Sequence, residues 1–514
     1  MKLDFSKNTR RNVIAGAFNR VVGLLFPFLN RTLFLWLMGP AYLGLNGLFS
    51  SILGVLALAE LGFGTAIVCS MYKPIADDDR PLICAYLRFY RTVYRCIGSV
   101  IFLGGLALLP FLKRLVHGDL PPDVDLHILY LLHLTNTAVS YFLFAYRGAV
   151  LSAHHRNDVL TNIRTLLSGA QYLTVFLLLI VTRHYPHRYI VYYLYVITTV
   201  IFTVIQNLLT MRASNRLFPE IAPRGQLAQE RRRKVVSDVA SIFMHKIGTV
   251  ISYSIDNVVL SAFLGLVTVA AYGNYYYVYT AIAGLPALIY SSMAGGFGNK
   301  IQTESREANF QLFMRVSRTV SIVIIWCAAM MLAMYQPFIA LWTRHKLVQH
   351  FLTAELMVVY FYVNQSRQVL LTFKAGAAIW REDRWKPVVG GIVKLAASLL
   401  FVRLFADSYK LDGVILASLI GYIFVQIPWE SHVLFTVFFD RQQAKVYWRS
   451  QARFALLALG VCVVTWAGAN AIPPGGMGTV ILKGVVAAAI SGTLLGVLFR
   501  RDLPILLEKM RGRR

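Results

Sequence analysis

The chain has 514 residues, of which 57% are hydrophobic and only 15% are charged, and its mean hydropathy is +0.58. Soluble domains carry about 25% charged residues, so this composition excludes a soluble protein and predicts an integral membrane protein. The formal net charge of +27 would suggest nucleic-acid binding in a soluble chain. Here the basic residues lie mostly in loops between apolar runs, which the positive-inside rule explains without nucleic acid.

About fourteen apolar runs follow one another along the chain, and most have roughly 20 to 28 residues, enough to cross a bilayer as helices. They lie near residues 12–37, 42–70, 84–110, 126–151, 158–182, 187–211, 237–264, 268–295, 311–340, 352–377, 387–406, 411–436, 452–470 and 478–499. The sequence therefore predicts an all-α integral membrane protein with about 14 transmembrane helices.

The first run, Val13 to Leu37, is interrupted by two polar pairs, Asn19-Arg20 and Asn30-Arg31. Their spacing of about eleven residues is almost three helical turns, so both pairs project from one face, roughly 16 Å apart. An Arg at the centre of a spanning helix costs about 2.5 to 3.5 kcal/mol on insertion scales, so this face is predicted to line a wet interior. The alternative is snorkelling, in which each Arg reaches the headgroups from the nearer end of the helix.

Loop charges predict the orientation of the chain. The leader, the run Arg231 to Lys234 and the tail from Arg500 are basic, whereas the opposite loops at 39–44 and 471–478 carry no base. This asymmetry places both termini in the cytoplasm. The longest polar insert, near the middle, reads as a linker. The predicted parts are an N-terminal lobe of six spans (1–211), a basic cytoplasmic linker (212–236), a C-terminal lobe of six spans (237–436), and two extra spans with a basic tail (437–514).

The two lobes read as a repeat. Shifting the first span by about 226 residues places Asn19-Arg20 on His245-Lys246, Asn30-Arg31 on Asp256-Asn257, and Gly39 on Gly265. Because both spans begin on the same side, the repeat is parallel. The sequence therefore predicts two six-helix bundles in a parallel pseudo-twofold arrangement around a central cavity, plus the two extra C-terminal helices.

Cations predominate among the polar residues expected in this cavity. Arg suits phosphate oxygens, so the cavity is predicted to bind a phosphate-bearing substrate. For Arg147, near the end of a span, snorkelling is the preferred alternative. The candidate substrate residues are Arg20, Arg31, Lys246, Asn19, Asn30, Asn257 and Arg147.

Two acids stand out within apolar spans, Glu60 in the second and Asp256 in the seventh. By helical rise, Glu60 is level with Arg20 and Asp256 with Arg31. Each acid is therefore a candidate either for an ion pair across the cavity or for H⁺ or Na⁺ coupling, as intramembrane acids often are.

Signals for an enzyme are weak. The sequence has no H-E-x-x-H, G-x-S-x-G or G-x-x-x-x-G-K-[ST] motif, and no large external loop on which a glycosyltransferase site is expected. The five cysteines lack metal-ligand or disulfide spacing. We expect no catalytic residue, no metal site and no cofactor beyond a coupling ion.

Three stretches resemble bacterial polysaccharide repeat-unit flippases of the Wzx type, which act in O-antigen, capsule and exopolysaccharide synthesis. These flippases belong to the multidrug/oligosaccharidyl-lipid/polysaccharide (MOP) exporter superfamily. The stretches are RTLFLWLMGPAYLGLNGLFSSILGVLALAELGFGTAIVCSMYKPIADDD from Arg31, YFLFAYRGAVLSAHHRNDV from Tyr141, and SIDNVVLSAFLGLVTVAAYGNYYYVYTAI from Ser254.

The resemblance implies a flippase, not an enzyme, with fourteen spans in two lobes and a cationic cavity, in the bacterial cytoplasmic membrane. Its substrate would be a sugar unit on undecaprenyl pyrophosphate, moved between leaflets by alternating access with ion coupling. Membrane lipids, a polysaccharide polymerase and glycosyltransferases of the same pathway would be its partners. The alternatives are a small-molecule or drug exporter of the same superfamily and, from another class, a membrane glycosyltransferase or polysaccharide polymerase.

Overall fold

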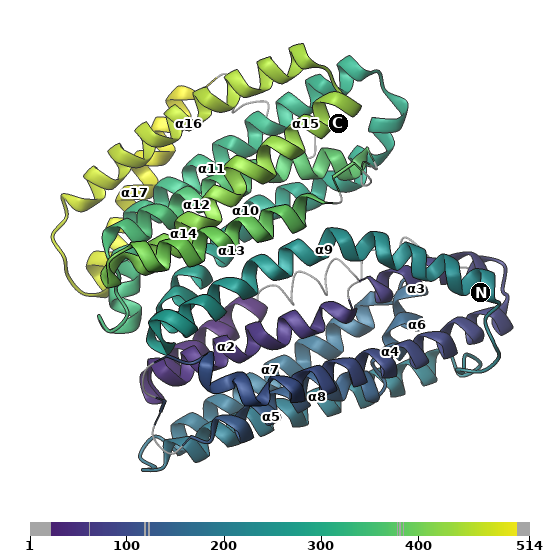
Figure 1. Ribbon diagram of the computed structural model, residues 1–514. Coiled ribbons are helices and arrows are strands. Elements are labelled where there is room, and N and C mark those ends of the chain that lie inside the picture. The colour runs from purple at the N-terminus through teal and green to yellow at the C-terminus, as the bar shows by residue number, and fades with distance from the viewer. Residues whose placement is uncertain are drawn as a thin grey trace. The chain divides into compact units, whose positions relative to one another are not determined.

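The computed structural model describes residues 22–500 apart from 61, 118–119, 122–123, 378, 380–381 and 384, and gives only the backbone of residues 59, 238, 240–253, 291–300 and 302–303. The chain divides into two compact units, Met1–Ala270 and Ala271–Arg514. Each is a bundle of helices (Figure 1), and the described residues form no strand.

Membrane-spanning character is clear from helix length and hydropathy. Within the described ranges, eight helices are long and apolar enough to cross a membrane, or nine if the bent pair Leu126–Phe142 and Ala145–Ala153 forms one span. Shorter apolar helices accompany them, among them Val22–Leu37 and Pro40–Leu56. The prediction of an all-α, multi-pass membrane protein is confirmed.

The first unit is built from long helices with short breaks. In order, they are Val22–Leu37, α2 (Pro40–Leu56), η1 (Ala57–Glu60), α3 (Phe63–Ala76), α4 (Arg80–Leu108), η2 (Leu109–Arg114), α5 (Leu126–Phe142), η3 (Ala145–Arg147), α6 (Gly148–Ala153), α7 (Asn157–Val181), α8 (Arg188–Leu217) and α9 (Gln229–Leu264). α4 packs on α5, α7 on α8, and α2 on α9.

Two of the predicted spans are not continuous helices. The second is interrupted between α2 and α3, where η1 is a 3₁₀ turn and Gly62 takes φ +98°. That left-handed conformation suits glycine because it has no Cβ. The fourth bends by 47° between α5 and the η3–α6 segment.

Glycines set the closest helix contacts of this unit. A Cβ on Gly98 of α4 would lie 2.7 Å from Cβ of Tyr141, and one on Gly105 would lie 2.4 Å from a methyl group of Leu134, so both glycines let α5 approach α4. Small residues at such contacts are the usual device for close packing in membranes. At Gly44 of α2 the neighbour is backbone, because a Cβ there would lie 1.9 Å from the carbonyl oxygen of Leu266.

Gly44→Ala is therefore expected to destabilise the protein by about 1 to 3 kcal/mol, since the facing carbonyl cannot rotate away. The matched control is Gly169→Ala in α7, where a Cβ meets nothing within 4 Å and helix propensity favours alanine. Thermal unfolding of both variants in detergent micelles measures the difference. Equal melting temperatures for Gly44→Ala and the wild type would contradict this packing.

The connection between α8 and α9 is shorter than the predicted 212–236 linker, because α8 continues to Leu217 and α9 begins at Gln229. The basic run Arg231 to Lys234 is exposed in the first turns of α9, consistent with the good helix propensity of Arg and Lys. The connection is bound to its own unit: Arg88 donates to the carbonyl of Gly225 at 2.9 Å, and the ring of Phe218 lies 4.1 Å from that of His154.

The second unit continues with long helices. They are α10 (Leu266–Thr303), which begins in the last residues of the first unit, α11 (Arg306–Thr343), α12 (Phe351–Gly376), α13 (Lys386–Leu404), η4 (Asp407–Tyr409), α14 (Lys410–Ile420), η5 (Gly421–Gln426), α15 (Ile427–Val437), α16 (Arg441–Asn470) and α17 (Met477–Leu498). η5 is a π-helical segment that joins α14 and α15. π segments inside α-helices occur frequently at functional sites.

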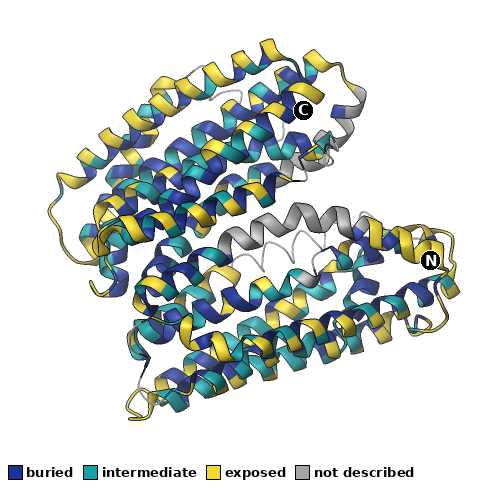
Figure 2. Ribbon diagram, viewed as in Figure 1, coloured by how far each residue is buried: buried dark blue, intermediate teal, exposed yellow. Residues whose placement is uncertain are grey.

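α11 is the central helix of this unit, since α12, α16 and α17 all pack on it. Ala333, Ala469 and Ala487, one from each of α11, α16 and α17, form a buried small-residue contact. Much of α16 is exposed in Figure 2, and Leu456 and Leu459 of this helix are 71% and 64% exposed. An apolar face of this kind fits contact with lipid.

Candidate functional site

Glu60 lies at the break in the second span and is bound by two tyrosines from other helices. The hydroxyl of Tyr141 (α5) donates to Oε2 at 2.5 Å, and the hydroxyl of Tyr94 (α4) donates to Oε1. Both tyrosines are buried. A carboxylate in a spanning segment needs such donors, because no bulk water surrounds it there.

The local sequence explains this arrangement. Tyr94 and Gly98 are one helical turn apart on α4, so both face Glu60 and α5, and Gly98 leaves space for Tyr141. Tyr90, one turn before Tyr94, stacks edge-on against it with ring centroids 4.3 Å apart. The break after η1 therefore places one acid among three phenols.

A buried cluster of charged residues lies in the second unit. Arg367 of α12 binds Glu430 of α15 in a bidentate pair, with Nε–Oε2 and Nη2–Oε1 distances of 2.8 Å. Lys386, the first residue of α13, contacts both Glu430 and Asp383, the latter at 3.1 Å. Lys374 of α12 also pairs with Asp383. The side chains are at most 10% exposed.

Polar side chains continue from this cluster along α12. The guanidinium of Arg367 lies 5.0 Å from the ring centre of Tyr422 in η5. The amide of Asn364 donates to the hydroxyl of Tyr279 at 3.0 Å and to that of Tyr422 at 3.4 Å. One face of α12 is therefore polar from Asn364 to Lys374. The π-helical segment η5 contacts this face through Tyr422.

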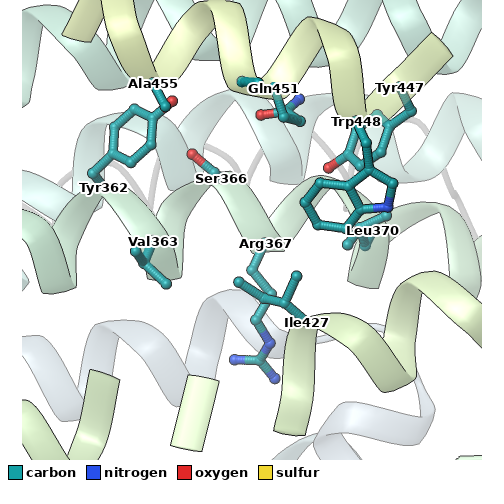
Figure 3. A pocket seen from close by; sticks show the side chains of 11 residues that line it. Tyr362, Val363, Ser366, Arg367, Leu370, Ile427, Tyr447, Trp448, Gln451 and Ala455 are labelled. Carbon is teal, nitrogen blue, oxygen red and sulfur yellow. The ribbon is translucent and has the colours of Figure 1, made fainter. Parts of the chain in front are cut away.

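A cavity of about 240 Å³ lies between α12, α15 and α16 (Figure 3) and is lined largely by apolar atoms. In Figure 3 the guanidinium of Arg367 points away from Gln451 and Trp448, which lie on the opposite wall. Gln451 donates to the hydroxyl of Ser317 at 2.7 Å, and the indole of Trp448 donates to the hydroxyl of Ser431 at 2.9 Å. The cavity wall is therefore largely apolar, and two of its polar side chains, those of Gln451 and Trp448, are bonded within the unit.

Asn30 and Arg31 of the first span are partly enclosed by other helices of their unit. Asn30 is buried, and its amide donates to the carbonyl of Tyr172 in α7 at 3.1 Å. Arg31 is half-buried and acts electrostatically on Tyr195 of α8. The polar face of this helix is therefore directed, at least at Asn30, towards protein and not lipid.

Arg147 is buried at the bend of the fourth span, and its guanidinium donates to the carbonyl of Ile221 at 2.7 Å. Ile221 belongs to the connection between α8 and α9. This contact holds the connection against the bend, which is a structural function besides the substrate contact predicted for Arg147.

Asp256 and Asn257 lie in α9, where Asp256 is 2% exposed. The amide of Asn257 donates to the hydroxyl of Ser51 in α2 at 2.8 Å. Among the remaining candidates, Asn19 and Arg20 lie outside the described residues, and Lys246 is in α9 at a position where the structure describes only the backbone.

The charged cluster of the second unit was not predicted from the sequence. The predicted span 387–406 begins just after Lys386, and Lys386 is only 5% exposed. Glu430 offered the available signal, because it falls inside the predicted span 411–436 and intramembrane acids are rare unless they are used.

Comparison with known proteins gives likeness in fold. No protein-family model and no curated protein matches the sequence. Among solved structures, the lipid II flippase MurJ in an inward closed conformation aligns with a TM-score of 0.68 at 12% identity, over 96% of this chain and 99% of that chain. An inward-facing multidrug resistance transporter of the MATE family in the MOP superfamily aligns with a TM-score of 0.61 at 12% identity, over 82% and 98% of the two chains. The chain has the fold of MOP-superfamily transporters.

A further structure with the MOP fold widens the range of functions found on it. It is described as a MOP-superfamily transporter from Pyrococcus furiosus in which a reverse polarity of the binding pocket suggests a different function. It aligns with a TM-score of 0.52 at 13% identity, over 83% of this chain and 96% of that chain. Substrate class therefore has to be argued from residues and not from the MOP fold.

Proposed function

We propose that the protein is a flippase that moves a lipid-linked oligosaccharide, carried on undecaprenyl pyrophosphate, across the bacterial cytoplasmic membrane by alternating access. The observation that carries the proposal is the extent of the fold match. The lipid II flippase aligns over 96% of this chain, whereas the MATE transporter aligns over 82% although nearly all of its own chain is used. We infer that the difference includes α16 and α17, the two helices outside the predicted repeat.

The basic residues of the first and seventh spans bind the pyrophosphate in this proposal. Arg20 and Arg31 offer guanidinium groups that hold phosphate oxygens in bidentate fashion, and Lys246 adds a point charge. The exposed apolar faces of the helices leave the polyprenyl tail in lipid while the sugar is moved.

Arg31→Gln tests this binding role in proteoliposomes that contain a labelled lipid-linked oligosaccharide. A charge-assisted hydrogen bond contributes about 1.5 to 3 kcal/mol, so we expect the apparent affinity for the lipid to fall roughly tenfold to a hundredfold. Arg188→Gln is the matched control, because Arg188 is an exposed first residue of α8. Equal transport by the Arg31 variant and the control would reject this role of Arg31.

Drug export is the alternative that the MATE structures favour. The same vesicles distinguish it: a labelled lipid that reaches the other leaflet unchanged supports the flippase, and accumulation of a cationic dye without lipid movement supports an exporter. Lengthened glycans would instead support an enzyme.

A further inference from the structure

Among the residues that the structure describes, the buried charged cluster of the second unit contains more bases than acids. Its members are Arg367, Lys374, Lys386, Asp383 and Glu430. With every group ionised, three positive charges face two negative charges in a site that is nearly closed to solvent. A net charge in such an environment is unfavourable, and protonating an acid would only increase it. The site becomes neutral when one base releases a proton.

Lys374 is the base best placed to release it. A guanidinium stays protonated in proteins, which excludes Arg367. Lys386 contacts two carboxylates, those of Glu430 and Asp383. Among the described residues Lys374 pairs with one carboxylate, that of Asp383, and shares it with Lys386.

In the described part of the chain, the surroundings of Lys374 add no acid beyond Asp383 and Glu430. Besides Asp383, the charged groups that act on it are Lys386, Glu430 and Arg367. From α11, the ring of Phe313 packs on Phe373, the residue before Lys374. η5 presents Tyr422 to Arg367. Two other acids near α12 lie away from Lys374. Asp412 of α14 binds Thr353 in the first turn of α12, and Glu382, after the end of α12, is exposed.

We propose that Lys374 is a proton-binding site of the second unit, and that its charged form holds Asp383 and the start of α13 against the end of α12. In the step, the ammonium of Lys374 loses one proton to water at this end of the unit, where Trp385 is 55% exposed, and becomes a neutral amine. The ion pair with Asp383 is then lost, and the cluster is left with two bases and two acids. This site goes beyond the flippase proposal and does not depend on which substrate is carried.

Asp383 connects the protonation of Lys374 to the backbone of the first turn of α13. Its carbonyl accepts from the amide of Lys386 at 3.1 Å, and the carbonyl of Trp385, two residues further on, accepts from the amides of Val388 and Val389. The first turn of α13 is therefore built on the segment that Lys374 holds. Deprotonation should loosen this turn, so amide exchange there should rise with pH beyond the intrinsic increase.

The test is hydrogen–deuterium exchange of the first turn of α13 in full-length protein in nanodiscs, measured across a pH series and corrected for intrinsic rates. In the wild type we expect protection to fall about tenfold as pH rises through the titration of Lys374, as for a local opening. Lys374→Met, which removes the base and leaves the charges balanced, should show the low protection at every pH. Lys374→Arg, which stays charged, should show the high protection at every pH.

Lys483→Met is the matched control, because Lys483 is a buried lysine of α17 outside the cluster, and it should keep the wild-type transition. A transition that persists in Lys374→Met, or its absence from the wild type, would overturn the proposal. Because exchange is measured without substrate, these results are independent of the transport assay. If Lys374→Met does not fold, the pH-independent protection of Lys374→Arg decides the question.

Discussion

Glu430→Gln is expected to be the most destabilising single change in the second unit, by about 3 to 5 kcal/mol. Glu430 is fully buried and is the only acid that binds Arg367 among the described residues. Removing its charge leaves three bases around Asp383 alone. A buried ion that loses its partner is much less favourable than the intact pair. Thermal unfolding in detergent micelles measures the loss.

Arg367→Met gives the informative comparison for this prediction. It removes the excess base, leaving two lysines and two acids, so we expect a smaller loss of about 1 to 2 kcal/mol from altered packing. Glu355→Gln, at an exposed acid of α12, should be neutral. If Arg367→Met is as damaging as Glu430→Gln, the imbalance of charge does not govern this cluster.

Glu60→Gln is expected to have the largest effect on transport. The amide still accepts from one tyrosine hydroxyl, but it cannot bind and release a proton, so gradient-driven flipping should fall about tenfold or more if this acid couples to an ion. Tyr141→Phe removes one donor and keeps the acid, so it should have a smaller effect. Proteoliposome flipping with and without an imposed proton or Na⁺ gradient measures both.

The control for this experiment is again Glu355→Gln, and size-exclusion profiles should match the wild type. Asp256→Asn is tested beside it, since Asp256 is the other acid predicted as a candidate for ion coupling. If Glu60→Gln and Asp256→Asn both transport normally and respond normally to the gradient, neither acid carries the coupling ion.

Hydropathy predicted the helical class well, because helix length follows from the thickness of the bilayer. The repeat predicted from spacing also has a local counterpart in the backbone. Gly39, before α2, has φ 101° and ψ 171°, and Gly265, after α9, has φ 88° and ψ 175°. Two glycines that the sequence aligned therefore take the same unusual conformation at the end of a helix.

The partners of Glu60 were not predictable from spacing. Tyr94 is 34 residues away and Tyr141 is 81 residues away, and both were simply apolar members of their spans. The interruption that turns Glu60 towards them lies inside a run whose hydropathy is continuous. Composition reports whether a segment enters the membrane, and it carries little information about where the helix within it breaks.

The burial of charged residues at the ends of spans was also not predicted. Lys386 lies where an apolar run begins, so its position suits a loop as well as a buried pair. Only the fold brings it to Glu430, 44 residues later. The cations predicted for the cavity and the cluster around Glu430 thus share no residue. The only sign of the cluster in the sequence was Glu430, an acid within an apolar run.

The π-helical turn at Gly421–Gln426 determines which way the acid after it points. A wide turn accommodates one more residue than a regular helix, and each residue advances the direction of the side chains by about 100°. Shortening this stretch by a single amino acid would therefore swing Glu430 roughly a quarter of the way around the helix axis and away from Arg367 and Lys386. The pairing of Glu430 with Arg367 and Lys386 therefore depends on helix register. Inserting or deleting one residue before Glu430 would break it without changing any charged residue.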